Sequence, residues 1–415
     1  MDEPLTIEGG HPLRGRVRIS GAKNASLVIM AASVMIKGET VLENVPRIRD
    51  VEVLCGILEH LGARVAWQED NSLCISVPEN IDVETPYELA KKLRASNLLL
   101  GSLLGRKGQA RICLPGGCNI GSRPMDLHLK GLSALGAEVK LEHGFVEAYT
   151  GNLSGTRVYL DFPSVGATEN IMMLAALTPG QTYVENAAKE PEIVDLANFL
   201  NAAGAKVRGA GTDLIRIEGV KELRGTRYTV IPDRIEAGTF MAAAVATGGD
   251  VLVENVIPTH LYSIMAKLQE TGAVIRQVNG GVRVIGPKEI MPVDVKTLPY
   301  PGFPTDMQSQ MMSLLATAKG TSVIVENVFE NRFQMVDEIK RMGAKVKVEG
   351  HTAVIEGVPA LYGARVKATD LRAGAALAIA GLAAQGLTEI ENAYYIYRGY
   401  ENFKAKLQNL GAHVW

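Results

Sequence analysis

A short stretch rich in glycine and proline holds the residues whose chemistry is easiest to read from the sequence. Residues 114–126 read LPGGCNIGSRPMD and include one thiol, one guanidinium and one carboxylate. The three glycines disfavour a regular helix or strand, so we expect a loop. Pro124 can start a helix, which apolar residues at 125, 129, 132 and 135 continue. Cys118 therefore precedes a helix N-terminus and lies close to Arg123, and both features favour a thiolate over a thiol.

A plainer interpretation of this stretch is a flexible loop that happens to contain a cysteine, since free cysteine is usually a small buried hydrophobe. The two glycines before Cys118 and the Arg-Pro helix start after it favour the reactive interpretation. The spacing of the cysteines matches no zinc site, and we expect all of them to be reduced. The other three lie in helix-like or strand-like patterns: Cys55, Cys74 and Cys113.

Composition narrows the class of protein. The chain has 415 residues, of which 47% are hydrophobic and 21% charged, and its net charge is -2. These values predict a globular protein of two domains and argue against a nucleic-acid binder driven by overall charge. The sequence has neither a secretion signal at Met1 nor an apolar run long enough to cross a bilayer, so we expect a cytoplasmic protein. We also expect no metal site, since the seven histidines form no cluster in the sequence.

Internal repetition organises the chain. A Gly-Ala pair recurs six times, each time after an amphipathic helical pattern and before a strand pattern. A glycine in that position predicts a left-handed helix C-cap. The six glycines are Gly62, Gly136, Gly204, Gly272, Gly343 and Gly411.

A second mark runs in step with the first, namely a glycine, a strand and then Glu-Asn. In one repeat Leu114-Pro115 stands in place of Glu-Asn, which is where the glycine-rich loop begins. A repeat that is broken in one copy is where we expect a function to have been added. The five regular copies end at Asn44, Asn186, Asn255, Asn327 and Asn392.

Each repeat also contains a helical segment that is apolar all round, which predicts a buried helix. Six such units predict two similar α/β domains of three repeats, each with helices packed inside sheets. The six segments are 25–36, 95–104, 171–177, 235–247, 307–318 and 373–384.

Polar or charged residues stand at the start of all six buried helices. Helix N-termini bind anions, and lysine or arginine adds full charge, so we expect anion binding there. The alternative is ordinary helix capping, above all for the three aspartates. Three charged loops, 186–192, 327–332 and 394–400, look solvated, although aromatic neighbours set Arg398 apart. The helix-start residues are Lys23, Asn24, Arg94, 164–168, Asp233, Arg234, Asp306, Asp370 and Arg372.

These motifs together resemble the UDP-N-acetylglucosamine enolpyruvyl transferases of the EPSP synthase-like family. The resemblance covers essentially the whole chain and depends on all the motifs in order, rather than on any one of them. It implies an inside-out α/β barrel fold in two domains, 23–232 and 1–22 plus 233–415, with the active site in the cleft between them. The motifs are at 20–24, 93–96, 115–118, 121–127, 164–168, 303–308, 368–373 and 398–401.

The resemblance implies transfer of the enolpyruvyl group of phosphoenolpyruvate to the 3′-hydroxyl of UDP-N-acetylglucosamine, with release of phosphate. Cys118 would donate the proton and form a covalent adduct, and Asp306 would be the general base. The catalytic set would also include Lys23, Arg398 and Asp370. The residues implied to bind phosphoenolpyruvate are Lys23, Asn24, Arg123, Arg372 and Arg398.

The resemblance also assigns a nucleotide-sugar site and a covalent inhibitor, fosfomycin, which would alkylate Cys118. No cofactor is implied. The chain departs from the family pattern at Phe162, where some members have lysine, and at Tyr397, where aspartate is expected. The residues implied to bind UDP-N-acetylglucosamine are Arg94, Arg123, Pro124, Met125, Asp126, Leu127, Phe162, Pro163, Ser164, Val165, Asp306 and Val328.

Two alternatives remain open at this point. The sister activity, 5-enolpyruvylshikimate-3-phosphate synthesis, would share the fold and phosphoenolpyruvate but does not use a loop cysteine. A non-catalytic scaffold or nucleotide-sugar sensor would need neither an acid nor a base, whereas this chain has both Cys118 and Asp306.

Overall fold

The computed structural model describes residues 3–114 and 125–415, and these divide into two compact units. The terminal unit comprises residues 3–20 and 232–415, and the central unit comprises 21–114 and 125–231. Each unit has a hydrophobic core of its own, since neither cluster of buried apolar side chains draws residues from the other unit. Cys118, Arg123 and Pro124 lie outside the described residues.

Three sheets form the outer part of the central unit. In each, a helix and two strands follow the first strand, and the second of these two strands pairs antiparallel with both the first strand and its own predecessor. The strands, in spatial order, are β13 (Leu223–Arg224), β3 (Ile36–Glu43), β5 (Leu73–Val77) and β4 (Arg64–Trp67), with β14 (Arg227–Thr229) also on β3; β6 (Gln109–Cys113), β8 (Phe145–Thr150) and β7 (Ala137–Glu142); and β11 (Lys206–Arg208), β12 (Leu214–Glu218), β10 (Gln181–Glu185) and β9 (Arg157–Tyr159).

The terminal unit repeats this plan, and the N-terminal segment completes two of its sheets. Strand β1 inserts antiparallel between β23 and β24, and β2 pairs parallel with β15. The strands, in spatial order, are β22 (Arg365–Lys367), β23 (Leu387–Glu391), β1 (Leu5–Glu8) and β24 (His413–Val414); β16 (Val274–Val278), β17 (Gly281–Ile285), β15 (Asp250–Glu254) and β2 (Arg14–Arg18); and β18 (Val295–Lys296), β19 (Thr321–Val325), β21 (Thr352–Glu356) and β20 (Lys345–Glu349).

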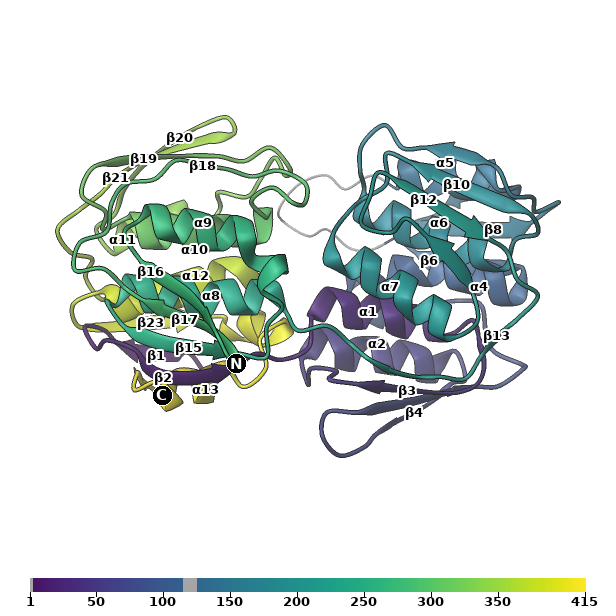
Figure 1. The fold of residues 1–415 in the computed structure, drawn as a ribbon, viewed down its shortest axis with the longest axis horizontal. Coiled ribbons are helices and arrows are strands. Elements are labelled where there is room, and N and C mark those ends of the chain that lie inside the picture. The colour runs from purple at the N-terminus through teal and green to yellow at the C-terminus, as the bar shows by residue number, and fades with distance from the viewer. Residues whose placement is uncertain (1–2, 115–124) are drawn as a thin grey trace. The chain divides into compact units, whose positions relative to one another are not determined.

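Within each unit the apolar helices lie inside the sheets, as Figure 1 shows for α8, α10 and α12. These helices have no polar face, and a helix that is apolar on all sides is stable only when every side is buried. The buried helices are α1 (Lys23–Ser33), η1 with α4 (Arg94–Leu98, Leu99–Lys107), α6 (Val165–Leu177), α8 (Arg234–Ala246), η3 with α10 (Thr305–Met307, Gln308–Leu315) and α12 (Leu371–Ala383).

Each amphipathic helix contacts the strand that follows it and ends at a repeated glycine. All six glycines have a positive φ, between 88° and 105°, so the predicted left-handed caps are confirmed. These helices are α2 (Arg49–His60), α5 (Asp126–Ala134), α7 (Pro191–Ala202), α9 (Tyr262–Glu270), α11 (Val336–Arg341) and α13 (Phe403–Asn409), with the short α3 (Tyr87–Ala90), η2 (Pro258–Leu261) and η4 (Ala393–Arg398) beside them.

Some predicted helix ends were wrong. Ile36 belongs to strand β3, where it pairs with Leu223, and the helix predicted to reach residue 318 ends at Leu315. The helix predicted at 95–104 begins as a 3₁₀ turn over its first residues. Buried apolar residues suit either kind of element, so the sequence pattern alone does not separate them at their ends.

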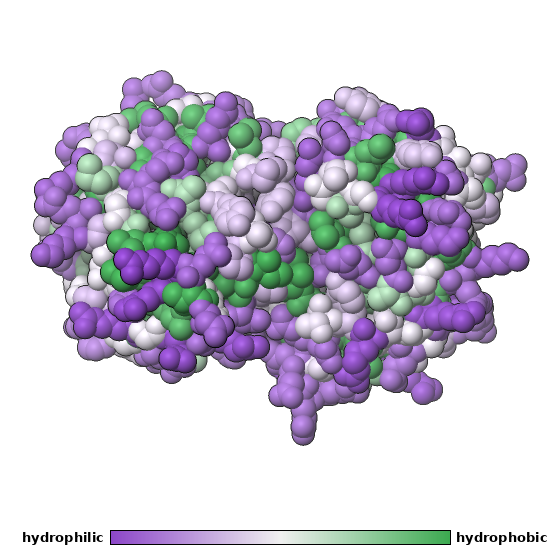
Figure 2. Space-filling model, viewed as in Figure 1, coloured by the Kyte–Doolittle hydropathy of each residue, from purple (hydrophilic) through white to green (hydrophobic). Residues whose placement is uncertain are grey.

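The surface fits a globular chain. On the face drawn in Figure 2, hydrophilic side chains predominate on each unit and hydrophobic ones occur in small groups. Among the described residues, no helix combines the length and the apolar character that a membrane span requires.

Candidate active site

In the terminal unit, Asp306 is held between two guanidinium groups. It lies in η3, the turn that starts the buried α10. Its Oδ1 accepts a hydrogen bond from Arg332 Nη2 at 2.5 Å, and its Oδ2 accepts one from Arg372 Nη2 at 2.9 Å. Both arginine side chains are almost fully buried, whereas the Asp306 side chain keeps 26% of its surface exposed. The carboxylate is therefore oriented on both oxygens and still reachable from solvent.

Arg332 is the residue of this group that sequence reasoning missed. The charged loop at 327–332 was expected to be solvated, and this prediction is wrong for Arg332, which is only 3% exposed. The loop folds inward because Glu326 accepts hydrogen bonds from the backbone amides of Val328 and Phe329, at 2.8 and 3.1 Å. Glu326 also accepts one from the hydroxyl of Thr305, the residue before Asp306, at 2.9 Å.

A buried polar network fixes Arg372 in turn. Arg372 Nη1 donates to the hydroxyl of Tyr400 at 3.2 Å, and that hydroxyl lies 3.0 Å from the hydroxyl of Thr239 and 3.3 Å from Gln310 Nε2. Burial by itself lowers the pKa of Arg372, but Asp306 and Tyr400 outweigh it, so the pKa stands above its ordinary value. Arg372 stays charged at any physiological pH.

Two of the predicted aspartates act as helix caps. Asp370 Oδ1 accepts the backbone N–H groups of Arg372 and Ala373 at 2.8 and 3.1 Å, which starts α12 and places Arg372. Asp233 caps α8 in the same way, with bonds of 2.8 and 3.0 Å. The capping interpretation is thus confirmed for these two residues, whereas the N-cap positions of η3 and α10 are Pro304 and Met307 rather than Asp306.

Residues just after Arg398 have structural partners in the terminal unit. Arg398 ends η4 and is partly buried, and Tyr397 beside it is half-buried, which raises its pKa. Helix α13 begins three residues after Tyr400, at Phe403. The carboxylate of Glu401 accepts the Ser20 hydroxyl at 2.6 Å, so the motif joins the N-terminal segment to the Tyr400 network.

A second buried ion pair lies beside this motif. Lys406 Nζ donates to Glu236 Oε1 at 2.5 Å and to the Ser20 hydroxyl at 2.7 Å. Burial raises the pKa of Glu236 to about 7, although Lys406 acts to lower it. The pair links α8, α13 and the N-terminal segment, and no sequence motif pointed to it.

In the central unit, Asn170 ties together the starts of three predicted binding segments. Its amide nitrogen donates to His128 Nδ1 at 2.9 Å and to the carbonyl of Asn97 at 3.2 Å, and its Oδ1 accepts the amide of Gly101 at 2.7 Å. It therefore joins α6 to α5 and to η1, which begins at Arg94. Neither Asn170 nor His128 was singled out from sequence, because a buried polar side chain on an apolar helix gives no signal beyond its type.

His128 is neutral in this setting. It is 5% exposed, and burial, with a smaller contribution from Arg94, lowers its pKa to about 4. A side chain at Gly166 would lie 2.8 Å from the imidazole, so only glycine lets α6 approach this closely. Met125 caps the same helix as His128, and its sulfur lies 3.4 Å from the Asn97 amide.

The remaining predicted residues of the central unit lie at the starts of buried or amphipathic helices. Lys23 begins α1 and pairs with the buried Asp50, with Nζ 3.1 Å from Oδ2. Ser164 caps α6 by accepting the amide of Ala167 at 3.4 Å. The other described positions range from partly buried to exposed: Asn24, Arg94, Asp126, Leu127, Phe162, Pro163 and Val165, with Val328 in the terminal unit.

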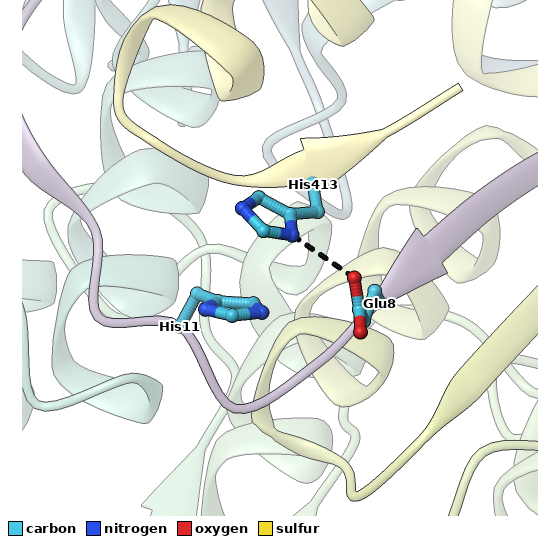
Figure 3. Close-up of side chains that lie close together, drawn as sticks. All are labelled: Glu8, His11 and His413. Atoms are coloured by element: carbon cyan, nitrogen blue, oxygen red, sulfur yellow. Dashed lines mark hydrogen bonds and ion pairs between the residues drawn. The ribbon is translucent and has the colours of Figure 1, made fainter.

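The histidines are dispersed in the sequence, but the fold brings two of them together. His11 and His413 stack in the terminal unit with ring centroids 4.0 Å apart, and Glu8 lies beside them (Figure 3). The two histidines are 402 positions apart in sequence, so only the insertion of β1 beside β24 brings them together. This cluster involves none of the residues predicted for catalysis.

Comparison with known proteins identifies the family. The family model of EPSP synthase (3-phosphoshikimate 1-carboxyvinyltransferase) matches residues 7–407. The chain is 57% identical to UDP-N-acetylglucosamine 1-carboxyvinyltransferase 1 of Caldanaerobacter subterraneus subsp. tengcongensis, over all of both chains. It is 58% identical to UDP-N-acetylglucosamine 1-carboxyvinyltransferase 2 of Carboxydothermus hydrogenoformans, over 99% of each chain.

Solved structures show the same fold. The enolpyruvyl transferase NikO from Streptomyces tendae matches with a TM-score of 0.89 at 26% identity, over 99% of this chain and 98% of that one. An EPSP synthase from Acinetobacter baumannii matches with a TM-score of 0.75 at 20% identity, over 100% of both chains. The predicted enolpyruvyl transferase fold is confirmed, and the chain belongs to the EPSP synthase family, among the UDP-N-acetylglucosamine 1-carboxyvinyltransferases.

Proposed function

We propose that this protein transfers the enolpyruvyl group of phosphoenolpyruvate to the 3′-hydroxyl of UDP-N-acetylglucosamine and releases phosphate, the first committed step of peptidoglycan synthesis. The observation that carries this conclusion is the 57% identity, over the whole chain, to a UDP-N-acetylglucosamine 1-carboxyvinyltransferase. The oriented carboxylate of Asp306 supports it, because a pure binding protein has no use for a positioned base.

We assign the charge-binding work to arginine and lysine. Phosphoenolpyruvate carries a phosphate and a carboxylate, so several cations must converge on it. We propose Lys23, Arg123, Arg372 and Arg398 for this role, with Asn24 beside Lys23. Asp370 serves by fixing the start of α12, from which Arg372 projects.

We assign the proton transfers to Cys118 and Asp306. In the addition step the vinyl CH₂ of phosphoenolpyruvate gains a proton, which Cys118 supplies, and the sugar hydroxyl loses one to Asp306 as its oxygen bonds to C2. In the elimination step this adduct loses phosphate and one proton of the new methyl group, which restores the vinyl group on the sugar oxygen. Guanidinium groups bind both oxygens of Asp306, so the sugar hydroxyl must approach through the 26% of the side chain that is exposed.

The nucleotide-sugar site is proposed from the helix starts. Amide groups at the N-termini of α5 and α6 favour the diphosphate, and Arg94 adds a full charge beside them. Phe162 contributes no charge, so Arg94 and Arg123 carry the diphosphate contacts. The full proposed set is Arg94, Arg123, Pro124, Met125, Asp126, Leu127, Phe162, Pro163, Ser164, Val165, Asp306 and Val328.

A phosphate-release assay tests the function and separates it from its nearest rival. Purified protein is mixed with phosphoenolpyruvate and either UDP-N-acetylglucosamine or shikimate 3-phosphate. We expect phosphate release only with the nucleotide sugar. Release with the shikimate ester alone would assign the sister activity, and release with neither would favour a binding protein.

The cellular setting and the inhibitor are also proposals. Both proposed substrates are phosphorylated and are retained inside cells, so we place the reaction in the cytoplasm. We propose that fosfomycin alkylates Cys118. Intact-mass analysis after treatment should give one adduct in the wild type and none in Cys118→Ser, whereas an adduct on Cys55, Cys74 or Cys113 would contradict the assignment.

A further inference from the structure

Glu8, His11 and His413 form a compact group in the terminal unit, and none of the three is among the residues assigned to the reaction. Glu8 ends strand β1 and lies directly opposite His413 in the antiparallel pairing with β24. His413 Nδ1 lies 2.9 Å from Glu8 Oε2. Opposed residues in such a pair project to the same face of the sheet, so the two side chains meet for reasons of register alone.

A tight glycine turn brings the third member back over the same face. The amides of Gly9 and Gly10 bond to the carbonyls of Gly386 and Leu382, at 3.1 and 3.0 Å. A side chain at Gly9 would lie 2.2 Å from the Ala384 carbonyl oxygen, so the turn requires glycine there. His11 follows this turn, and its ring stacks on that of His413 with a tilt of 30°.

The possible ligand atoms of the three side chains lie close to one another. Figure 3 shows a ring nitrogen of each histidine on the side that faces the Glu8 carboxylate. One ligand atom from each residue lies within 4.8 Å of the other two. Ligand atoms around a tetrahedral Zn²⁺ are separated by about 3.4 Å, given metal–ligand distances of about 2.1 Å. Small rotations of these partly exposed side chains would close that difference.

We propose that Glu8, His11 and His413 form a binding site for one divalent transition-metal ion of the Zn²⁺ type, with solvent completing the coordination. Two imidazole nitrogens and one carboxylate oxygen suit borderline ions such as Zn²⁺, Ni²⁺ and Cu²⁺, and not Mg²⁺ or Ca²⁺, which prefer all-oxygen sites. Carboxylate and imidazoles are all accessible, with 46% of the Glu8 and 53% of the His413 side chain exposed.

The ion would cross-link the N-terminal and C-terminal segments of the chain. The pairing of β1 with β24 is short and includes the mutual backbone bonds of Thr6 and Trp415, at 2.9 and 3.0 Å. His413 belongs to the C-terminal strand and His11 follows the N-terminal one, so a shared ion cross-links the two ends. It would suppress fraying of an edge strand that has only two residues.

Titration of Zn²⁺ into the full-length protein tests the site. The protein should carry no histidine tag, should be freed of metal with a chelator, and should have its accessible thiols alkylated so that cysteine does not compete. We expect one ion per chain in isothermal titration calorimetry. His11→Ala and Glu8→Gln should each weaken binding by at least about tenfold, while Mg²⁺ should not bind.

His351→Ala is the matched control, because His351 is also an exposed histidine of the terminal unit and lies outside the cluster. It should leave Zn²⁺ binding unchanged. Hydrogen exchange supplies a second readout: Zn²⁺ should slow exchange at Thr6 and Trp415 in the wild type and in His351→Ala, but not in His11→Ala. No binding to the wild type, or equal binding by His11→Ala and the wild type, would overturn the proposal.

Discussion

The carboxylate of Asp306 and its two arginine partners give the clearest account of function at the scale of single residues. Two buried guanidiniums fix both oxygens while 26% of the side chain remains exposed. A carboxylate used only for stability would gain nothing from that exposure, since buried pairs are stabilised by exclusion of water. The geometry instead suits a base that must meet a substrate hydroxyl.

Replacing Asp306 with asparagine tests this role. The amide keeps the size of the carboxylate and one acceptor oxygen but cannot take up a proton. We expect kcat to fall by about 10²–10⁴-fold, the usual range for loss of a general base, with little change in nucleotide-sugar affinity. Steady-state kinetics and calorimetry measure the two effects. A variant with wild-type kcat would remove Asp306 from the mechanism.

His128 links the pH dependence of stability to the central unit. Its pKa is about 4 when folded, against an ordinary value of 6.5. Because the unfolded chain takes up this proton first, stability is lost as the pH falls from about 6.5 to 4. The shift corresponds to about 3 kcal/mol.

The matched variant is His128→Gln, whose side-chain oxygen can still accept the Asn170 amide. Urea unfolding of both proteins between pH 7 and pH 4 should show that the difference in stability between them shrinks or reverses as the pH falls. Buried acids such as Glu236 have raised pKa values, so they make the fold more stable as the pH falls, opposite to His128. This contribution is the same in both proteins and cancels when their free energies of unfolding are subtracted. Parallel curves for the two proteins would contradict the account.

Sequence reasoning found individual charged residues more easily than their partners. Asp306 and Arg372 could be predicted because each stands at the start of an apolar helix. Arg332 and Tyr400 could not, since one lies in a loop that looked solvated and the other in an aromatic run. Their roles depend on backbone bonds to Glu326 and on packing against Thr239, which no local pattern encodes.

At the scale of elements, the repeated glycines and the repeated Glu-Asn asparagines have different structural roles. The glycines end helices in the left-handed conformation. Four of the five Glu-Asn asparagines also have positive φ. The amide of Asn186, for example, donates to the carbonyl of Leu160 at 2.7 Å, which ties β10 to the end of the neighbouring β9. The sequence predicted the glycine caps but not this tie, because it joins residues of different repeat segments.

Two of the glycine caps form a matched pair for mutation in the central unit. A Cβ at Gly136 would lie 2.4 Å from the Asn152 carbonyl oxygen, whereas one at Gly204 would meet nothing within 4 Å. Gly204→Ala should therefore cost only the strain of the left-handed backbone, about 1–2 kcal/mol. Gly136→Ala should cost more, because backbone must also move. Urea unfolding that ranks the two variants equally would refute this explanation.

At the scale of the whole molecule, the chain is two units with separate cores, and the N-terminal segment belongs to the terminal one. Leu5, Ile7 and Ile19 are almost fully buried there. The three-fold repetition could be predicted from the glycine spacing. The pairing of β1 with β23 and β24, and of β2 with β15, could not be read from local patterns, because β1 and β2 resemble any other short strands. Only the family resemblance placed residues 1–22 with the C-terminal half of the chain.

Ile7→Ala tests whether the two cores are independent. The lost side chain leaves a cavity worth about 2–5 kcal/mol in the terminal unit. Hydrogen exchange should therefore speed up in α8, α10 and α12, with α1, α4 and α6 unchanged. Leu103→Ala, a fully buried site of the central unit, should give the reverse pattern. Equal acceleration in both units for either variant would show that the cores unfold together.

The identity of the product tests the account most directly. Phosphoenolpyruvate labelled with ¹³C is incubated with UDP-N-acetylglucosamine and the protein, and the nucleotide sugar is examined by NMR. We predict a labelled vinyl ether joined to the sugar at O3, formed in step with phosphate. A nucleotide sugar that remains unlabelled while phosphoenolpyruvate is consumed, or a label attached at any other oxygen, would contradict it.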